Sequence, residues 1–180
     1  VGDSFTAGTA NSPYLTYARR VAHLLGADQV IYAGLGGSGW TTTSPPPFSG
    51  RMSQVLSMNP HIVVFQGSRN DSWGNIPALQ SAVTSTVNLA ASVPYVFVTG
   101  YWMANNGTGN DAVKAGTLAA GRQFVDLMGI IYGTGRVGAT TGNGNADIYV
   151  DTDNVHPTQV AHTYIANRLW QALQGSFSVT

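Results

Sequence analysis

Two short apolar runs, rich in β-branched and aromatic residues, constrain the fold of this chain more than any other feature. The first spans 61–66 (HIVVFQ) and the second spans 95–99 (YVFVT). Neither run alternates between apolar and polar residues, which is typical of parallel strands that are buried on both faces. Segments with helical spacing separate the runs, and this alternation predicts a parallel sheet covered by helices on both faces. We therefore expect an α/β fold, specifically a three-layer α/β/α sandwich.

The remaining expected elements fit one domain over residues 1–180, with a mostly parallel, flavodoxin-like sheet of about five strands. In the strand order 2-1-3-4-5 the first strand is central, yet only Val1 precedes the sequence Gly2-Asp3-Ser4 at which that strand should end. We expect this N-terminal strand to be truncated, supplied upstream of this numbering, or replaced by another segment. Further strands are expected at 30–33 and 124–127, and helices at 15–25, 51–58, 77–91, 111–121 and from 157 onward.

The composition is that of a globular protein with a neutral, polar surface. Hydrophobic residues make up 43% of the chain, charged residues only 9%, and the formal net charge is zero. This balance gives no electrostatic reason to expect nucleic acid or an anionic membrane as a partner. The absence of cysteine excludes disulfides and thiolate catalysis, and no apolar run approaches the roughly 20 residues of a membrane span. No signal peptide is present, but the low charge favours an extracellular or virion-associated protein.

Candidate catalytic residues lie near both ends of the chain. Ser4 follows the expected end of a strand, where open α/β folds place their chemistry. A serine nucleophile needs a base within hydrogen-bond reach, and His156 offers one, with Asp153 three residues earlier to orient its ring. The Asn70 amide, an N–H group of the glycine loop 34–39 and the N–H of Ser4 are suitable donors for the negative charge that develops in acyl transfer. The pattern indicates acyl transfer by a serine nucleophile.

Four sequence blocks resemble those of the SGNH (GDSL-type) serine hydrolases and occur in the same order. Gly-Asp-Ser alone is a weak signal, but four blocks at expected strand or helix edges, covering nearly the whole chain, are specific. The resemblance implies an ester hydrolase that requires no metal or cofactor. The blocks are Gly2-Asp3-Ser4, the glycine loop, Gly67-x-x-Asn70-Asp71 and Asp153-x-x-His156-Pro157-Thr158, which resemble blocks I, II, III and V.

The resemblance also implies a role for each matching residue. Ser4 becomes the nucleophile, His156 the general base and Asp153 its orienting partner. His162 lies six residues beyond the base, inside the expected final helix, and is interpreted as structural.

The oxyanion hole implied by the resemblance consists of the Ser4 N–H, the Asn70 side-chain amide and one glycine N–H. Gly37 fits the family's loop best, and Gly39 is the alternative. The sequence departs from the family's pattern in two places. Block III has two residues before Asn70 where one is common, and Asn154 replaces a common glycine of block V, which a left-handed backbone accepts.

Large aromatic residues fall on loops at the expected active edge of the sheet. Such residues are often loop anchors, but several on one rim indicate stacking against a sugar or an apolar acyl group. Arg69 either contacts the substrate or pairs with Asp71, and the pair is slightly favoured. The aromatic residues are Trp40, Trp73, Trp102 and Tyr101.

The sequence therefore predicts a serine esterase that hydrolyses carboxylic esters through an acyl-enzyme. The neutral surface and the aromatic rim favour short acyl groups, such as acetyl on a carbohydrate, although a fold does not determine a substrate. One alternative is a lipase or thioesterase for longer acyl chains. The other is a non-catalytic SGNH-like module that binds glycans or serves a structural role. The oligomeric state is left open.

Overall fold

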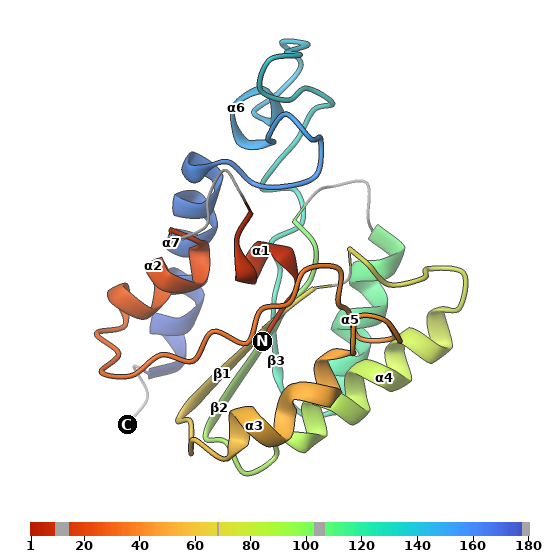
Figure 1. Cartoon of the computed structure of the whole chain (residues 1–180), viewed down its shortest axis with the longest axis vertical. Coiled ribbons are helices and arrows are strands. Elements are labelled where there is room, and N and C mark those ends of the chain that lie inside the picture. The colour runs from red at the N-terminus through yellow and green to blue at the C-terminus, as the bar shows by residue number, and fades with distance from the viewer. Residues whose placement is uncertain (10–14, 68, 103–106, 178–180) are drawn as a thin grey trace.

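The computed structural model describes residues 1–9, 15–67, 69–102 and 107–177, which form a parallel sheet between two layers of helices (Figure 1). The expected α/β/α sandwich is confirmed. Helices α2 and α7 cover one face of the sheet, and α3, α4 and α5 cover the other. In chain order the elements are α1 (Ser4–Ala7), α2 (Tyr17–Leu24), η1 (Phe48–Arg51), α3 (Met52–Leu56), β1 (Ile62–Gln66), α4 (Ile76–Leu89), β2 (Tyr95–Thr99), α5 (Gly107–Ala119), β3 (Gln123–Val125), α6 (Ala146–Tyr149) and α7 (Gln159–Phe177).

The regular part of the sheet consists of β1, β2 and β3, which are parallel and adjacent in that order. Side chains of β2 alternate between the two faces, as a pleated strand requires. Val96 and Val98 belong to the cluster beneath α4 and α5, whereas Phe97 points into the cluster beneath α7. Both faces of β2 are therefore buried, which explains why the strand is a continuous apolar run in the sequence.

The expectation of about five strands is wrong, because the regular sheet has three. The expected strand at 30–33 does not form, and Val30, Ile31 and Tyr32 are 40%, 41% and 38% exposed. This segment lies at the edge of the sheet and joins it only at Gly34, which bridges to Gly2. With a partner on one side only and its side chains in solvent, the apolar run lacks the burial that would extend the pairing.

Residues 1–3 occupy the central position that the flavodoxin-like order assigns to the first strand. Gly2 makes parallel bridges to Gly34 on one side and to Gln66 at the end of β1 on the other. The Val1 carbonyl accepts a hydrogen bond from the Gln66 N–H at 2.9 Å. The spatial order is thus residue 34, residues 1–3, β1, β2 and β3. This order places Ser4 at the carboxyl edge of the sheet, beside the loop that follows β1.

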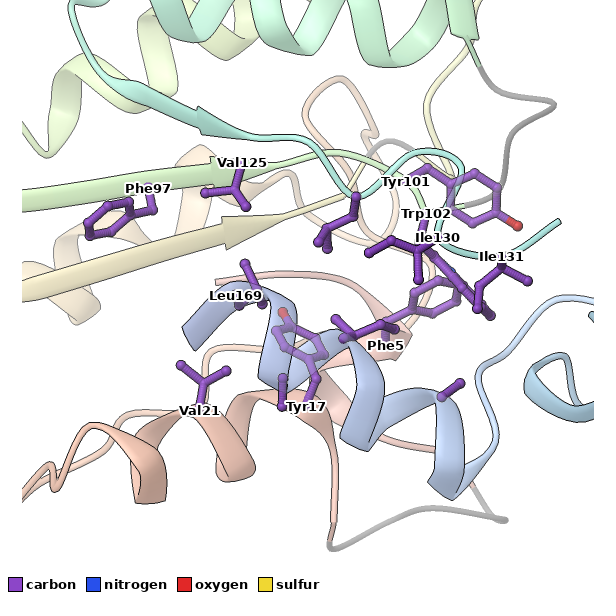
Figure 2. Close-up of a cluster of buried hydrophobic side chains, with 14 of the residues drawn as sticks. Phe5, Tyr17, Val21, Phe97, Tyr101, Trp102, Val125, Ile130, Ile131 and Leu169 are labelled. Carbon is purple, nitrogen blue, oxygen red and sulfur yellow. The ribbon is translucent and has the colours of Figure 1, made fainter. Parts of the chain in front are cut away.

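The core is divided into two clusters, one on each face of the sheet. Figure 2 shows the first, in which aromatic and aliphatic side chains fill the space between the sheet, α2 and α7. Burying a large apolar side chain stabilises a fold by about 1.5–3 kcal/mol, so these rings are major contributors. The first cluster includes Phe5, Tyr101, Trp102 and Leu169, and the second includes Trp40, Phe48, Phe65 and Leu79.

Local signals explain where the covering helices begin. The Asn75 side chain caps α4 by accepting a hydrogen bond from the Ala78 N–H, and Pro77 lies in the first turn, where its missing N–H costs nothing. The helices expected at 77–91 and 111–121 correspond to α4 and α5. Among the helices that the structure describes, none is both long and apolar enough to span a membrane.

Candidate active site

Ser4 begins α1, a single helical turn packed tightly against the strand that precedes it. Asp3 is the N-cap of this turn, and its Oδ1 accepts a hydrogen bond from the Phe5 N–H at 2.9 Å. A Cβ atom on Gly2 would lie 2.1 Å from the Thr6 hydroxyl oxygen, so a side chain does not fit there. The Gly-Asp-Ser sequence therefore has a local explanation: glycine leaves room for the helix, aspartate caps it, and serine lies half-buried at its start.

Ser4, His156 and Asp153 lie in hydrogen-bond contact although 152 residues separate the first two. His156 Nδ1 is 2.5 Å from Asp153 Oδ2, and His156 Nε2 is 2.8 Å from Ser4 Oγ. In the neutral ring, Nδ1–H donates to the carboxylate and Nε2 accepts from the serine hydroxyl. The side chains of His156 and Asp153 are 22% and 45% exposed, so the group is open to solvent on one side. This geometry permits proton transfer from Ser4 to His156.

The loop 151–156 orients Asp153 through its own backbone. Asp153 Oδ1 accepts hydrogen bonds from the N–H groups of Val155 and His156, both at 2.9 Å. Burial raises the pKa of the Asp153 carboxyl, but the hydrogen bonds from His156 and Val155 outweigh it and hold the pKa below its ordinary value. Asn154 has φ 62°, the left-handed conformation expected at this position. The carboxyl is thus ionised and aimed at the imidazole.

Phe5 supports the imidazole from below and is a residue that sequence reasoning missed. Its ring packs edge-on against the His156 ring, with centroids 5.5 Å apart, and is itself held between Tyr101 and Trp102. The Phe5 side chain is 2% exposed, and Figure 2 shows it among the buried hydrophobic side chains. Its only signal in the sequence is a large apolar side chain directly after the candidate nucleophile.

The backbone N–H groups of Ser4, Gly36 and Gly37 have no acceptor among the described residues, and Gly37 has φ 76°, a conformation that favours glycine. The Gly39 N–H, in contrast, donates to the Thr42 hydroxyl at 2.9 Å. The geometry therefore favours Gly37 over Gly39 as an oxyanion donor. Gly36 is also near, since a Cβ atom there would lie 3.9 Å from the Ser4 Cβ.

Asn70 connects the loop after β1 to the glycine loop. Its Nδ2 donates one hydrogen bond to the Ser38 carbonyl at 2.9 Å, and an amide nitrogen carries a second hydrogen that remains for another acceptor. The neighbouring Asp71 carboxylate accepts from both the N–H and the hydroxyl of Thr41, at 2.7 and 2.9 Å. Burial raises the pKa of the Asp71 carboxyl, while the bonds from Thr41 oppose this shift. Asp71 is thus a structural residue that joins the loop after β1 to Thr41, just beyond the glycine loop.

The expected aromatic rim is wrong for three of its four members. Trp40, Tyr101 and Trp102 are 2%, 4% and 1% exposed, because their rings fill the two core clusters and not the solvent edge. Of the four, only Trp73 is exposed, at 38%. The favoured pair of Arg69 with Asp71 is not found among the described residues, where the Arg69 guanidinium lies 5.9 Å from the Tyr101 ring centroid.

Two buried titratable groups near the site differ in the direction of their pKa shifts. Asp3 is fully buried, and burial, reinforced by the charge of Asp71, raises its pKa to about 7 against the bond from the Phe5 N–H. Burial lowers the pKa of His162 to about 4, and its Nδ1 accepts from the Tyr17 N–H. His162 therefore packs as a neutral structural side chain. In the described ranges, no three His, Asp or Glu side chains are grouped closely enough to hold a metal ion.

Two solved structures have a fold similar to that of this chain. The fold is similar to that of a lipase/acylhydrolase from Enterococcus faecalis, with a TM-score of 0.72 and 18% identity over 97% of this chain and 93% of that one. It is also similar to a protein of the G-D-S-L lipolytic family from Desulfitobacterium hafniense DCB-2, with a TM-score of 0.64 and 15% identity over 95% of both chains. At these identities the likeness shows the fold alone. No curated protein matches the chain.

The sequence itself carries the family assignment. The model of the GDSL-like lipase/acylhydrolase family matches residues 1–164, which is most of the chain and includes all four sequence blocks. Membership of this family indicates a hydrolase that acts on esters. The protein therefore belongs to the GDSL-like lipase/acylhydrolase family.

Proposed function

We propose that this protein is a serine esterase that works through an acyl-enzyme. The observation that carries the proposal is the contact of His156 with both partners: Nε2 lies 2.8 Å from Ser4 Oγ while Nδ1 lies against Asp153. A hydroxyl, a base and an orienting carboxylate in this order are what activation of a serine nucleophile requires.

In the proposed mechanism, Ser4 Oγ attacks the ester carbonyl carbon as its proton passes to His156 Nε2. The imidazolium then returns that proton to the alcohol oxygen, which leaves as the carbon–oxygen bond breaks. In the second half, His156 takes a proton from water, the resulting hydroxide attacks the acyl carbon, and Ser4 regains its proton as the acid departs. Asp153 stays ionised throughout and stabilises the imidazolium.

The negative charge on the carbonyl oxygen is stabilised by the N–H groups of Ser4 and Gly37 and by the second Nδ2 hydrogen of Asn70. These donors are oriented before the reaction. Their hydrogen bonds to the carbonyl oxygen therefore strengthen as negative charge develops, and no reorganisation is needed. The free Gly37 N–H and the occupied Gly39 N–H support the choice between the two glycines.

For the substrate we propose a short acyl group, such as acetyl, on a carbohydrate. A charged fraction of 9% and zero net charge suit a neutral polymer better than an anionic headgroup. Trp73, which stays exposed, offers a ring face for a sugar. The half-buried Arg69, four residues before Trp73 in the same loop, is the second candidate contact.

The test is hydrolysis of p-nitrophenyl acetate, butyrate and octanoate by the wild type and Ser4→Ala, together with acetate release from an acetylated polysaccharide. We expect serine-dependent activity that declines as the acyl chain lengthens. A preference for octanoate would replace the short-acyl substrate with a lipid-like one. Equal rates for the two proteins on every ester would refute the serine mechanism and leave a binding module.

A further inference from the structure

Arg51 has no role in the mechanism above, yet it touches the strand that carries the nucleophile. It is half-buried at the end of η1. Its Nη2 donates to the Gly2 carbonyl at 2.9 Å and to the Ser38 hydroxyl at 3.1 Å, and its Nη1 donates to the Pro46 carbonyl at 3.3 Å. One guanidinium group thus bonds to Gly2, Ser38 and Pro46, of which Gly2 lies 49 residues away in the sequence.

Two of these acceptors lie directly beside the proposed reacting groups. Gly2 is two residues before Ser4, and Ser38 directly follows Gly37. The Ser38 carbonyl also accepts the hydrogen bond from Asn70. Arg51 therefore links the nucleophile strand to the glycine loop, which carries the proposed donor Gly37 and accepts a hydrogen bond from the proposed donor Asn70.

The position of the guanidinium is itself restricted by packing. Its central carbon lies 5.3 Å from the centroid of the Phe48 ring, which is completely buried. The Phe48 N–H donates to the Gly39 carbonyl at 2.9 Å, and the same ring occupies the space where a Cβ atom of Gly67 would lie. Phe48 thus contacts Arg51, the glycine loop and the loop that follows β1.

We propose that Arg51 is a positioning residue that sets the distance between Ser4 and the oxyanion donors Gly37 and Asn70. The proposal rests on the esterase function above, and Arg51 contacts neither substrate nor reacting atoms. A planar guanidinium holds two acceptors in fixed relative positions, which a single ammonium or amide group does not. Its loss should weaken stabilisation of the transition state more than substrate binding.

The experiment compares kcat and KM for p-nitrophenyl acetate in Arg51→Gln, Arg51→Lys and a matched control, Arg122→Gln. Arg122 is also half-buried and donates to a backbone carbonyl, that of Ala91 at 2.7 Å, but at the amino-terminal end of β3. We expect Arg51→Gln to lower kcat by about 10–100-fold with KM within about twofold, and Arg51→Lys to recover part of the loss. Arg122→Gln should lower the melting temperature and leave kcat and KM unchanged. If Arg51→Gln does not fold, Arg51→Lys carries the test.

A double-mutant cycle with Asn70→Ala separates positioning from general stability. If Arg51 acts through Ser38 and Asn70, Arg51→Gln should cost no more than about threefold in kcat once Asn70 is gone, because coupled residues are not additive. An equal loss in both backgrounds, or an unchanged kcat in Arg51→Gln, would overturn the proposal.

Amide NMR spectra give a readout that does not depend on hydrolysis. Arg51→Gln should shift the Gly37 and Ser38 backbone signals and the Asn70 side-chain signals, and Arg122→Gln should leave them in place. Unchanged signals in Arg51→Gln would overturn the positioning role even if the wild type hydrolysed no ester. Absence of serine-dependent hydrolysis, with these signals shifted, would instead refute the esterase function alone.

Discussion

The site has two halves that rest on opposite faces of the sheet. The base half consists of Ser4, His156 and Asp153, and the oxyanion half consists of Gly37 and Asn70. The base half is backed by aromatic packing: Phe5 lies under the imidazole as part of the first core cluster. The oxyanion half is held by polar contacts and lies against the second cluster, through residues such as Phe48 and Trp40.

This difference shows how the two halves depend on the rest of the chain. The base half brings together segments 152 residues apart, so it needs the whole fold to be in place. The oxyanion half is assembled within residues 37–71 by hydrogen bonds whose donors and acceptors are mostly backbone groups and short polar side chains. Removing one side chain should therefore abolish the function of the first half but only weaken that of the second.

The largest effect is expected from breaking the base half. Ser4→Ala and His156→Ala should each lower kcat by a factor on the order of 10⁴–10⁶, because neither residue activates the nucleophile without the other. For the same reason the double variant should be little worse than either single one. Steady-state kinetics of the three variants on p-nitrophenyl acetate measures this. Additive losses would show that the two residues do not act as a unit.

A smaller effect is expected from breaking the oxyanion half. Asn70→Ala should lower kcat by about 10²–10³ with little change in KM, since the amide binds the charge that develops in the transition state. Asn75→Ala is the matched control: it removes the α4 cap and should cost about 1 kcal/mol of stability without changing kcat. A rise in KM alone for Asn70→Ala would place Asn70 in substrate binding instead.

The smallest effect concerns Asp3, which lies where the two halves meet. Its pKa is about 7 in the folded protein and near 3.8 when unfolded, so between these values the folded state keeps a proton that the unfolded state loses. Stability from this group is therefore present below about pH 4 and falls as pH rises to about 7. Asp3→Asn should remove this pH dependence. Between about pH 4 and pH 7 the free energy of unfolding of the variant should rise, relative to that of the wild type, by on the order of a few kcal/mol.

Urea unfolding of the wild type and Asp3→Asn at several pH values between about 4 and 7 measures the difference. His162 titrates with the opposite sign, since its pKa, lowered from 6.5 to about 4, makes stability fall as pH decreases between these values. It is present in both proteins, so its contribution cancels in the comparison. Parallel stability curves would show that Asp3 does not carry a raised pKa.

Much of the fold could be predicted from local patterns. The runs at 61–66 and 95–99 are strands because both of their faces are buried, and this burial is visible in their composition. The run at 30–33 has similar residues but lies at an edge, and nothing in its own sequence distinguishes the two situations. The aromatic residues were misjudged for a related reason: a loop position in the sequence does not reveal whether a ring points outward, as Trp73 does, or into a core, as Trp40 does.

The sequence by itself determined the fold class, the family and the candidate residues Ser4, Asn70, Asp153 and His156, because these follow from residue types at short, specific spacings. Their catalytic roles stay predictions until the kinetics above are measured. Only the tertiary structure decided that Gly37 and not Gly39 has a free N–H, that Phe5 supports the imidazole, and that Arg51 joins the two loops. These features depend on which groups meet after long-range packing, and no local pattern encodes such contacts.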